Sequence, residues 1–484
     1  MKINFIQEPE LKFGNGNAID PKDGIRTFYP YDIDQVRPRE IKTAFIGSTE
    51  SVNKVITWFD GLQSKIEGKE SEKKRLFQGF PGIDPNFAFC TEIVHDDSYQ
   101  RIIQNSILQQ AIKDNENLND RIETVVEIYI NEIKFLSKNK KVDVIICVLE
   151  ENYISLLLEQ GSEMNPKDLE SKVEDQELNS NKESKKRDQY ETNFRRLLKA
   201  RSMKYGIPIQ IVRDRIVKSK SDMQDQATIA WNLTTALYYK AGGIPWGMIT
   251  NRNEITCYAG ISFYKSRDRE TLQTSIAQIF NELGKGVILR GEPVSTISED
   301  RIPHLTKDQA YSLIDTSLKE YKEAIKTVPQ RMVLHKSSNF SDDEVEGFLD
   351  AIKNKHGILS VDLVTIQKGS DLRLFRQNLY APRRGTLLSI SDTEHLLYTR
   401  GSVEYYETYT GKYPPSPLEI KIFHCDSSPL LICEEIVSLT KMNWNNSSFD
   451  RKNPITIECA NKVGEILKYL DQDEKEQMKY SFYM

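Results

Sequence analysis

Short apolar runs alternate with amphipathic segments along most of the chain, and this alternation restricts the fold more than any other feature. In the first half, the apolar runs 43–47 and 141–149 lie on either side of a segment, 123–139, whose apolar residues recur at helical spacing. Apolar runs that alternate with amphipathic helices are typical of a parallel sheet with helices packed on it. The sequence therefore predicts an α/β fold with a doubly wound sheet in this half.

The character of the sequence changes after residue 245. From there, the runs 257–265 and 331–336 predict strands, 386–399 predicts a hairpin, and 270–282 has the spacing of an amphipathic helix. Antiparallel opening strands followed by alternating helices fit a ribonuclease-H-like sheet, although periodicity alone leaves other mixed sheets open. The sequence predicts a second, mixed α/β domain here.

The length of 484 residues suffices for two to four domains. We expect residues 1–40 to form a strand and loop segment that packs on the core, 41–245 to form the first domain, and 246–484 to form the second. The segment 161–190 has 14 charged residues among 30, a composition that cannot bury enough apolar surface to fold alone. We expect this segment to be a flexible insertion in the first domain.

The composition excludes several classes of protein. The longest apolar runs are far shorter than the roughly 20 residues that span a bilayer, and the chain begins with neither a signal nor a transit pattern. The six cysteines lie far apart and form no Cys-x-x-Cys pair, which is typical of a reducing compartment. We therefore expect a cytoplasmic protein that enters no membrane.

One window of the sequence is strongly basic although the chain as a whole is mildly acidic. The 66 basic residues against 71 acidic residues give a net charge of −5, which argues against nucleic-acid binding by the whole surface. Between residues 195 and 220, however, nine basic residues accompany a single acid, Asp214. The window predicts either a solvated helix surface or a local anion-binding site beside the strand-like run 207–212.

Four stretches of sequence carry a resemblance to a known family. Together, and in this order along the chain, they resemble the short prokaryotic Argonautes, which consist of MID and PIWI domains. The stretches are EPELKFGNG at 8–16 followed by DPKDGI at 20–25, FRRLLKARSMKYGIPIQIV at 194–212, ALYYKAGGIPW at 236–246 and NPITIECANKVGEIL at 453–467. The resemblance implies a Rossmann-like MID domain over 41–245 and a ribonuclease-H-like PIWI domain over 246–484.

The resemblance also implies a pocket for the 5′ phosphate of a guide strand. Matched position by position, the family's anchor falls on Arg195, Lys199, Gln210 and Lys240, with Arg195 where many Argonautes have a tyrosine. A terminal phosphate carries about two negative charges and three acceptor oxygens, so it favours converging cations and an orienting amide. Taken singly, Lys199 fits a solvated helix residue and Gln210 a strand-edge side chain better than a binding site, whereas the set in register favours the pocket. A magnesium ion at the guide 5′ end is the one cofactor expected.

The PIWI-like segment departs from the active members of the family. Where they have a metal-binding aspartate on the first strand, this chain has Ser262, and where they have one on a later strand it has Lys336. A hydroxyl or an ammonium group cannot replace a carboxylate as a ligand of catalytic metal ions. Glu458 and Cys459 lie near the position of the last expected ligand. The sequence thus predicts a protein that is not an enzyme.

The function implied by the resemblance is guide-directed recognition in prokaryotic defence. A 5′-phosphorylated guide RNA would pair with single-stranded DNA of a plasmid or phage, and the complex would activate an APAZ-containing partner. In the family this partner often carries a TIR or sirtuin-like domain that degrades NAD, or a nuclease domain. The sequence leaves open whether target binding drives oligomer formation. Two other functions stay open: a guide-directed nuclease with nonstandard metal ligands, and an α/β interaction protein that binds no nucleic acid.

Overall fold

The chain folds into two compact units. The computed structural model describes 1–484 except residues 72, 116, 158–192, 218–224, 250–253, 266–271, 281–287, 295–302, 370, 378–380, 410, 412, 450, 471–473 and 475. The smaller unit comprises Pro38–Gly242 and Tyr469–Lys475, and the larger unit comprises Met1–Arg37, Gly243–Lys468 and Glu476–Met484. The predicted insertion 161–190 lies outside the described residues. Residues 1–37 belong to the larger unit although the smaller unit follows them in the chain.

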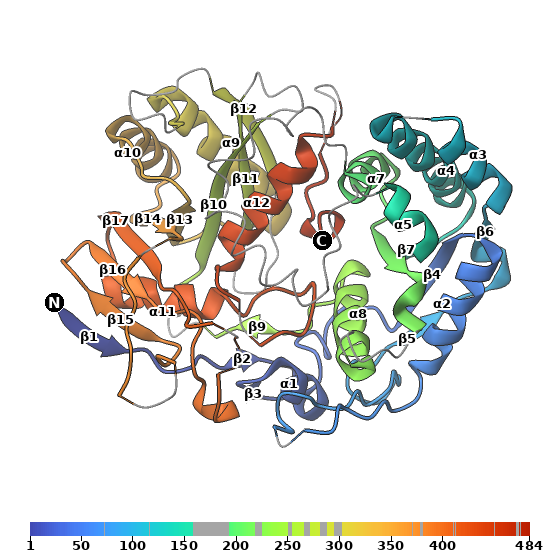
Figure 1. Ribbon diagram of the computed structural model, residues 1–484. Helices are drawn as coiled ribbons and strands as arrows, with labels where there is room; N and C mark the ends of the chain where they lie inside the picture. Colours follow the sequence, from blue (N-terminus) through green and yellow to red (C-terminus); the bar gives the residue numbers. More distant parts are fainter. Residues whose placement is uncertain are drawn as a thin grey trace. The chain divides into compact units, whose positions relative to one another are not determined.

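The smaller unit is built on a parallel sheet with strand order β5-β4-β7-β8, and β6 pairs with β4. Its strands are β4 (Glu40–Gly47), β5 (Glu92–Val94), β6 (Gln100–Ile102), β7 (Val144–Leu149) and β8 (Ile209–Arg213). The helices around the sheet are α2 (Thr49–Gly61), α3 (Asn105–Lys113), α4 (Leu118–Asn139), α5 (Glu151–Leu157), α7 (Phe194–Ser202) and α8 (Gln226–Lys240) (Figure 1). This arrangement confirms the predicted alternation of strands and helices.

Local chemistry explains where these elements begin and how they pack. Strand β7 is buried along its whole length, as its unbroken apolar sequence predicts. Helix α2 begins at Thr49 because the Ser48 hydroxyl accepts a hydrogen bond from the Ser51 amide. Helix α4 buries Tyr129, whose hydroxyl donates to the Val148 carbonyl at 2.6 Å and so ties the helix to β7.

The larger unit contains a nine-stranded sheet in the order β1-β15-β16-β17-β14-β13-β10-β11-β12. The three central strands β14, β13 and β10 are parallel to one another, and the other neighbours are antiparallel. The strands are β1 (Lys2–Phe5), β10 (Thr256–Lys265), β11 (Leu272–Phe280), β12 (Leu289–Val294), β13 (Arg331–Lys336), β14 (Ser360–Gln367), β15 (Thr386–Ser389), β16 (Glu394–Leu397) and β17 (Leu418–Cys425). Strands β15 and β16 form the predicted hairpin.

Helices bury both faces of this sheet. The helices are α9 (Lys307–Ile325), α10 (Asp342–Leu349), α11 (Pro429–Leu439) and α12 (Ile455–Leu467). Helices α9 and α10 cover one apolar cluster, which includes Ile261 and Leu334, and α11 covers a second, which includes Val364 and Ile420. Figure 1 shows α12 running along β10 and β11. Both clusters consist of buried residues, so the sheet is the core of this unit.

The helix predicted over 270–282 is wrong, because Leu272–Phe280 forms strand β11. Its apolar residues at 272, 276 and 279 fit helical spacing, but short apolar runs are ambiguous between the two structures. Strand β11 pairs antiparallel with both β10 and β12, the strands before and after it in the chain, and this pairing decides the outcome.

Residues 1–37 are held in the larger unit by strand pairing and by a short helix. Strand β1 pairs with β15, and a small second sheet joins β2 (Leu11–Lys12) to β3 (Asn17–Ala18) and to β9 (Gly247–Met248). Helix α1 (Pro21–Phe28) begins at Asp20, whose carboxylate accepts from the Lys22 and Asp23 amides. Gly24 is required in this helix, since a Cβ there would lie 2.0 Å from the Phe13 ring.

Glu8 anchors the same segment through two buried cations. Its carboxylate lies 2.8 Å from the Arg384 guanidinium and 3.1 Å from the Lys441 ammonium, and Lys441 also donates to the Pro9 carbonyl at 2.5 Å. Arg384 and Lys441 are 3% and 1% exposed. Burial raises the pKa of Glu8, but Arg384 and Lys441 more than offset this effect and hold the pKa below its usual value. The first of the four recognised stretches is therefore an internal ionic anchor.

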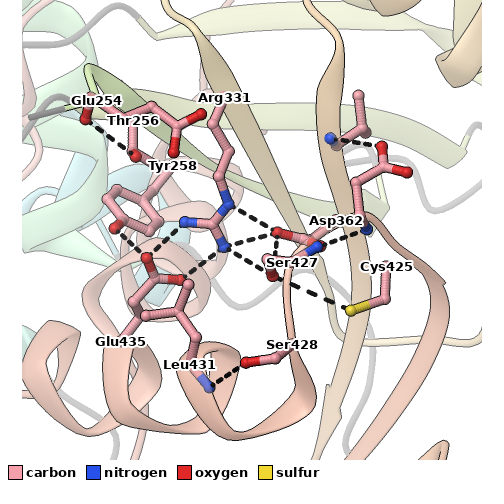
Figure 2. A network of polar contacts seen from close by, with 12 residues as sticks. Glu254, Thr256, Tyr258, Arg331, Asp362, Cys425, Ser427, Ser428, Leu431 and Glu435 are labelled. Carbon is pink, nitrogen blue, oxygen red and sulfur yellow. Dashed lines mark hydrogen bonds and ion pairs between the residues drawn. The ribbon is translucent and has the colours of Figure 1, made fainter. Parts of the chain in front are cut away.

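A second buried network lies at the beginning of β13 (Figure 2). The Arg331 guanidinium donates to Asp362 at 2.8 and 2.6 Å and to Glu435 at 2.5 and 2.9 Å. Ser427 and Tyr258 complete the network by donating to Asp362 and Glu435 at 2.9 and 2.8 Å. Arg331 and Asp362 are both fully buried, so their charges are compensated within the protein alone.

The Glu8 anchor predicts a loss of stability in acid. A carboxyl group whose pKa is lowered on folding contributes stability above its unfolded pKa of about 4.3, and this contribution is lost as the pH falls through the lower folded pKa. Glu8→Gln should therefore unfold more easily than the unchanged chain at pH 7, and the difference should shrink below about pH 4. Urea unfolding midpoints measure this difference, with the exposed Glu10→Gln as matched control. A difference that does not depend on pH would contradict the ionic anchor.

Candidate nucleic-acid interface

Three arginines gather at the carboxyl end of β8 in the smaller unit. Arg213 ends the strand, Arg215 lies in the following 3-10 turn, and Arg195 lies in the first turn of α7, which begins after the capping residue Asn193. Arg215 forms an ion pair with Glu151 at 3.0 Å. Ligands of parallel α/β sheets bind beyond the carboxyl ends of the strands, so this cluster occupies a favourable position for a binding site.

Positive charge exceeds negative charge in this cluster of arginines. Arg195 keeps part of its side chain exposed, but the surrounding protein, together with the positive charges of Arg213 and Arg215, lowers its pKa to about 10. Burial and Arg215 lower the pKa of Arg213 as well, and Glu151 partly offsets both effects. Guanidinium groups carry a positive charge at neutral pH, so the three repel one another. An anion placed among them would relieve this repulsion.

The structure places the four predicted anchor residues on three elements. Arg195 and Lys199 are one turn apart on α7, Gln210 lies in β8, and Lys240 is the last residue of α8 and is 5% exposed. The Gln210 amide donates to the Ile211 carbonyl at 3.2 Å. Gln210 and Arg213 are three residues apart and leave opposite faces of the strand. The convergence of the four residues on one phosphate stays a prediction.

Arg213 and Arg215 are candidate residues that the matched set of four does not contain. Both lie within the basic window 195–220, so the charge pattern of the sequence already indicated them as candidates. Their position directly after an apolar strand was the additional signal, because residues that follow parallel strands meet at one edge of the sheet. The basic residues 218 and 220 of the same window lie outside the described residues.

In the larger unit, the structure does not bring Ser262 and Lys336 together. The parallel pairing of β10 with β13 aligns Gly260 with His335 and Ile261 with Lys336. Because side chains alternate along a strand, Ser262 shares its face with His335, whereas Lys336 lies on the opposite face. Carboxylates at 262 and 336 would consequently point away from each other.

Lys336 is an internal ion-pair partner. Its ammonium group donates to both carboxylate oxygens of Glu344 at 2.6 Å, and it lies 5.2 and 5.3 Å from the ring centres of Phe263 and Phe340. Glu344 also accepts from the Leu305 amide at 3.0 Å. Lys336 and Glu344 are both fully buried. Burial lowers the pKa of Lys336 although Glu344 acts in the opposite direction.

The face that carries Ser262 is closely covered by α12. A Cβ at Gly260 would lie 2.2 Å from the Thr456 carbonyl, so glycine is needed for the helix to approach the strand this closely. His335 is fully buried, and its Nδ1 lies 2.8 Å from the Thr456 hydroxyl. Burial and the nearby Arg331 charge lower the pKa of His335 to about 3, so its ring is neutral.

Glu458, which the sequence places near the last expected ligand, is engaged elsewhere. Its carboxylate accepts from Asn443 at 3.0 Å and lies 2.8 Å from Arg451 and 3.1 Å from Lys462. Within the part of the chain that the structure describes, no group of three or more His, Cys, Asp or Glu side chains could hold a metal ion. In the same part of the chain, no helix is both long enough and apolar enough to cross a membrane.

Comparison with known proteins identifies the fold. No family model and no curated protein matches the sequence. Among solved structures, Clostridium butyricum Argonaute bound to a guide DNA and a 19-mer target DNA matches 98% of this chain and 53% of its own, with 16% identity and a TM-score of 0.66. Drosophila Piwi matches 99% of this chain and 56% of its own, with 12% identity and a TM-score of 0.61.

A third structure, Marinitoga piezophila Argonaute in complex with a 5′ OH guide RNA, matches 100% of this chain and 59% of its own, with 14% identity and a TM-score of 0.56. The chain thus spans slightly more than half the length of the proteins it matches. The matches confirm the predicted fold class, a Rossmann-like MID domain with a ribonuclease-H-like PIWI domain. The smaller unit has the MID type of sheet, and the larger unit has the PIWI type.

The buried Lys336–Glu344 pair yields a stability prediction. Lys336→Met removes the cation and leaves the Glu344 carboxylate buried, a change that costs about 3–5 kcal/mol of unfolding free energy. Urea unfolding measures the loss. Lys307→Met is the matched control, since Lys307 and its partner Glu346 lie on the surface, and its unfolding midpoint should stay unchanged. Equal midpoints for the two variants would show that the Lys336 pair is not a structural element.

Proposed function

We propose that the chain binds a short guide strand and uses it to recognise a complementary target strand. The observation that carries this proposal is the cluster of Arg195, Arg213 and Arg215 at the carboxyl end of β8, within a chain whose two units both have Argonaute-type folds. Base pairing would select the target, while the protein would contact the backbone and the shape of the duplex.

The guide is held at its 5′ phosphate in this proposal. Arg195, Lys199, Gln210 and Lys240 form the anchor, and the excess positive charge beside Arg195 favours a doubly charged phosphate over a hydroxyl group. The solved neighbours include one bound to a guide DNA and one bound to a 5′ OH guide RNA, so guide chemistry varies among proteins of this fold. A 5′-phosphorylated RNA is the guide proposed for this chain.

The residues around Arg195 do not suit a magnesium ion at the guide 5′ end. Magnesium prefers oxygen ligands, especially carboxylates, whereas this cluster holds three guanidinium groups. Its two carboxylates are engaged, because Glu151 pairs with Arg215, and Asp214 accepts from the Glu151 amide at 2.9 Å and lies 4.0 Å from Lys54. The proposed anchor therefore neutralises the phosphate with side-chain cations alone.

The proposed protein recognises its target without cutting it. One buried face of β10 and β13 presents Ser262 and the neutral His335, and the opposite face holds the Lys336–Glu344 pair. Two-metal cleavage needs clustered carboxylates at such a site. The output of target recognition would then come from another chain.

That chain is, in this proposal, an APAZ-containing partner with a TIR or sirtuin-like domain that degrades NAD. The proposed setting is prokaryotic defence in the cytoplasm, with plasmid or phage DNA as the target and oligomer formation on target binding. This part of the proposal rests on the four recognised stretches of sequence, because the partner's chemistry is carried by no residue of this chain.

The anchor is tested by comparing one RNA that carries either a 5′ phosphate or a 5′ hydroxyl group at fixed salt. Lys199→Ala should weaken binding of the phosphorylated RNA by about 1–3 kcal/mol, the range for a charge-assisted hydrogen bond, or roughly 5- to 150-fold. Its effect on the hydroxyl form should be small. Lys204→Ala is the control, since Lys204 is exposed, lies in the same basic window and pairs with Glu474. Unchanged affinity for the phosphorylated RNA would refute the role of Lys199.

The alternative function, guide-directed cleavage with nonstandard ligands, makes a different prediction. A labelled target annealed to the guide should stay intact over a titration with magnesium or manganese if the protein only recognises it. Metal-dependent cleavage that Ser262→Ala abolishes would establish the nuclease instead. An α/β protein without a nucleic-acid function would show no change of thermal stability with either RNA.

A further inference from the structure

The nine-stranded sheet of the larger unit ends at β1 within the described residues, and β1 pairs on one side only, with β15. Ile6 donates its amide hydrogen to the Gly385 carbonyl at 2.8 Å, and Asn4 lies opposite Leu387. In an antiparallel pair, alternate residues bond to the neighbour. The backbone groups of Lys2, Asn4 and Ile6 therefore face β15, while those of Ile3 and Phe5 face the open edge.

The side chains along this edge are apolar and exposed. Met1, Ile3 and Phe5 alternate along the strand and so share one face, and they are 94%, 64% and 49% exposed. Ile390, one residue beyond the end of β15, is 36% exposed. Single exposed apolar residues are ordinary, but a contiguous patch beside free backbone groups is typical of an association surface.

We propose that this edge pairs with the β1 strand of a second copy of the chain, in an antiparallel arrangement about a two-fold axis at Asn4. In this register, Ile3 lies opposite Phe5 of the second copy, and Phe5 lies opposite its Ile3. The backbone groups that face the open edge in one copy then meet the corresponding groups of the other. The two sheets become one continuous sheet across the axis.

Side-chain chemistry favours this register over its neighbours. It creates two pairs of an aromatic residue with a β-branched residue, and such cross-strand pairs each stabilise a sheet by about 0.2–1 kcal/mol. A register centred on Ile3 would instead place Phe5 opposite Met1. The register at Asn4 also places Lys2 opposite Ile6, so that no like charges face each other across the two strands.

The size of the contact sets its strength. Two four-residue strands bury far less than the roughly 1,200–2,000 Å² of a stable specific interface. The pairing is consequently a weak, reversible association that grows with the concentration of the chain. It is independent of the proposed guide binding, because it uses only the edge of the larger unit.

Sedimentation velocity over a concentration series tests the association. The unchanged chain should shift from monomer toward dimer as its concentration rises, and Phe5→Lys or Ile3→Lys should weaken the association about tenfold, because each variant replaces one member of both Ile3–Phe5 pairs with a charged edge residue. Val36→Lys is the control, since Val36 is a fully exposed apolar residue of the same unit outside the edge, and this variant should associate like the unchanged chain. A chain that stays monomeric, or a dimer that the Phe5 and Ile3 variants leave intact, would overturn the proposal.

Cysteine cross-linking tests the register itself. Asn4 is the one position of β1 that would meet its own copy on the axis, in a pair without direct backbone hydrogen bonds whose Cα atoms are about 4.5 Å apart. This distance suits a disulfide. Asn4→Cys should therefore form a covalent dimer on mild oxidation, while Lys2→Cys and the unchanged chain with its native cysteines should not. A cross-link that forms equally well through position 2 would contradict the register.

Discussion

The buried Arg331 guanidinium is the interaction on which the larger unit most depends. It holds Asp362 of β14 and Glu435 of α11 from a position at the beginning of β13, and Tyr258 of β10 donates to the same Glu435. Three parallel strands and one helix are thus tied together at the amino ends of the strands. Because a one-residue slip would turn every side chain to the other face of the sheet, this network also helps to decide which residues of β10 and β13 are buried together.

The two units supply different chemistry. The smaller unit concentrates positive charge at the carboxyl end of a parallel sheet, where Arg195, Arg213 and Arg215 repel one another in the absence of an anion. The larger unit neutralises its buried charges internally, as the Lys336–Glu344 and Arg331–Asp362 pairs show. An unbalanced charge is suited to holding an anionic strand, and an internally neutralised site is suited to packing. This contrast is the physical basis for proposing recognition without cleavage.

Much of the fold could be predicted from the sequence because it follows from local patterns. The buried strand β7, the hairpin of β15 and β16 and the alternation around β4 and β8 all have clear periodicity. Strand β11 could not be predicted, because its spacing fits a helix and only pairing with β10 and β12 decides its structure. The placement of Ser262 and Lys336 on opposite faces could not be predicted either, because the sequence indicates the two strands but not the register in which they pair. Arg213 and Arg215 were visible as charges, but their gathering beside Arg195 depends on the packing of α7 against the end of β8.

The ionic anchor of Glu8 has a consequence for how the chain is made. Glu8 and Lys441 are 433 residues apart in sequence, and β1 must wait for β15 before it can pair. During synthesis, most of the smaller unit is complete before Arg384 and Lys441 are made, so residues 1–37 must wait for partners that lie far later in the chain. Contacts of such long range slow folding and leave strand edges open for longer. Until β15 emerges, β1 therefore remains an unpaired strand, and chaperones that bind extended apolar segments have their longest opportunity there.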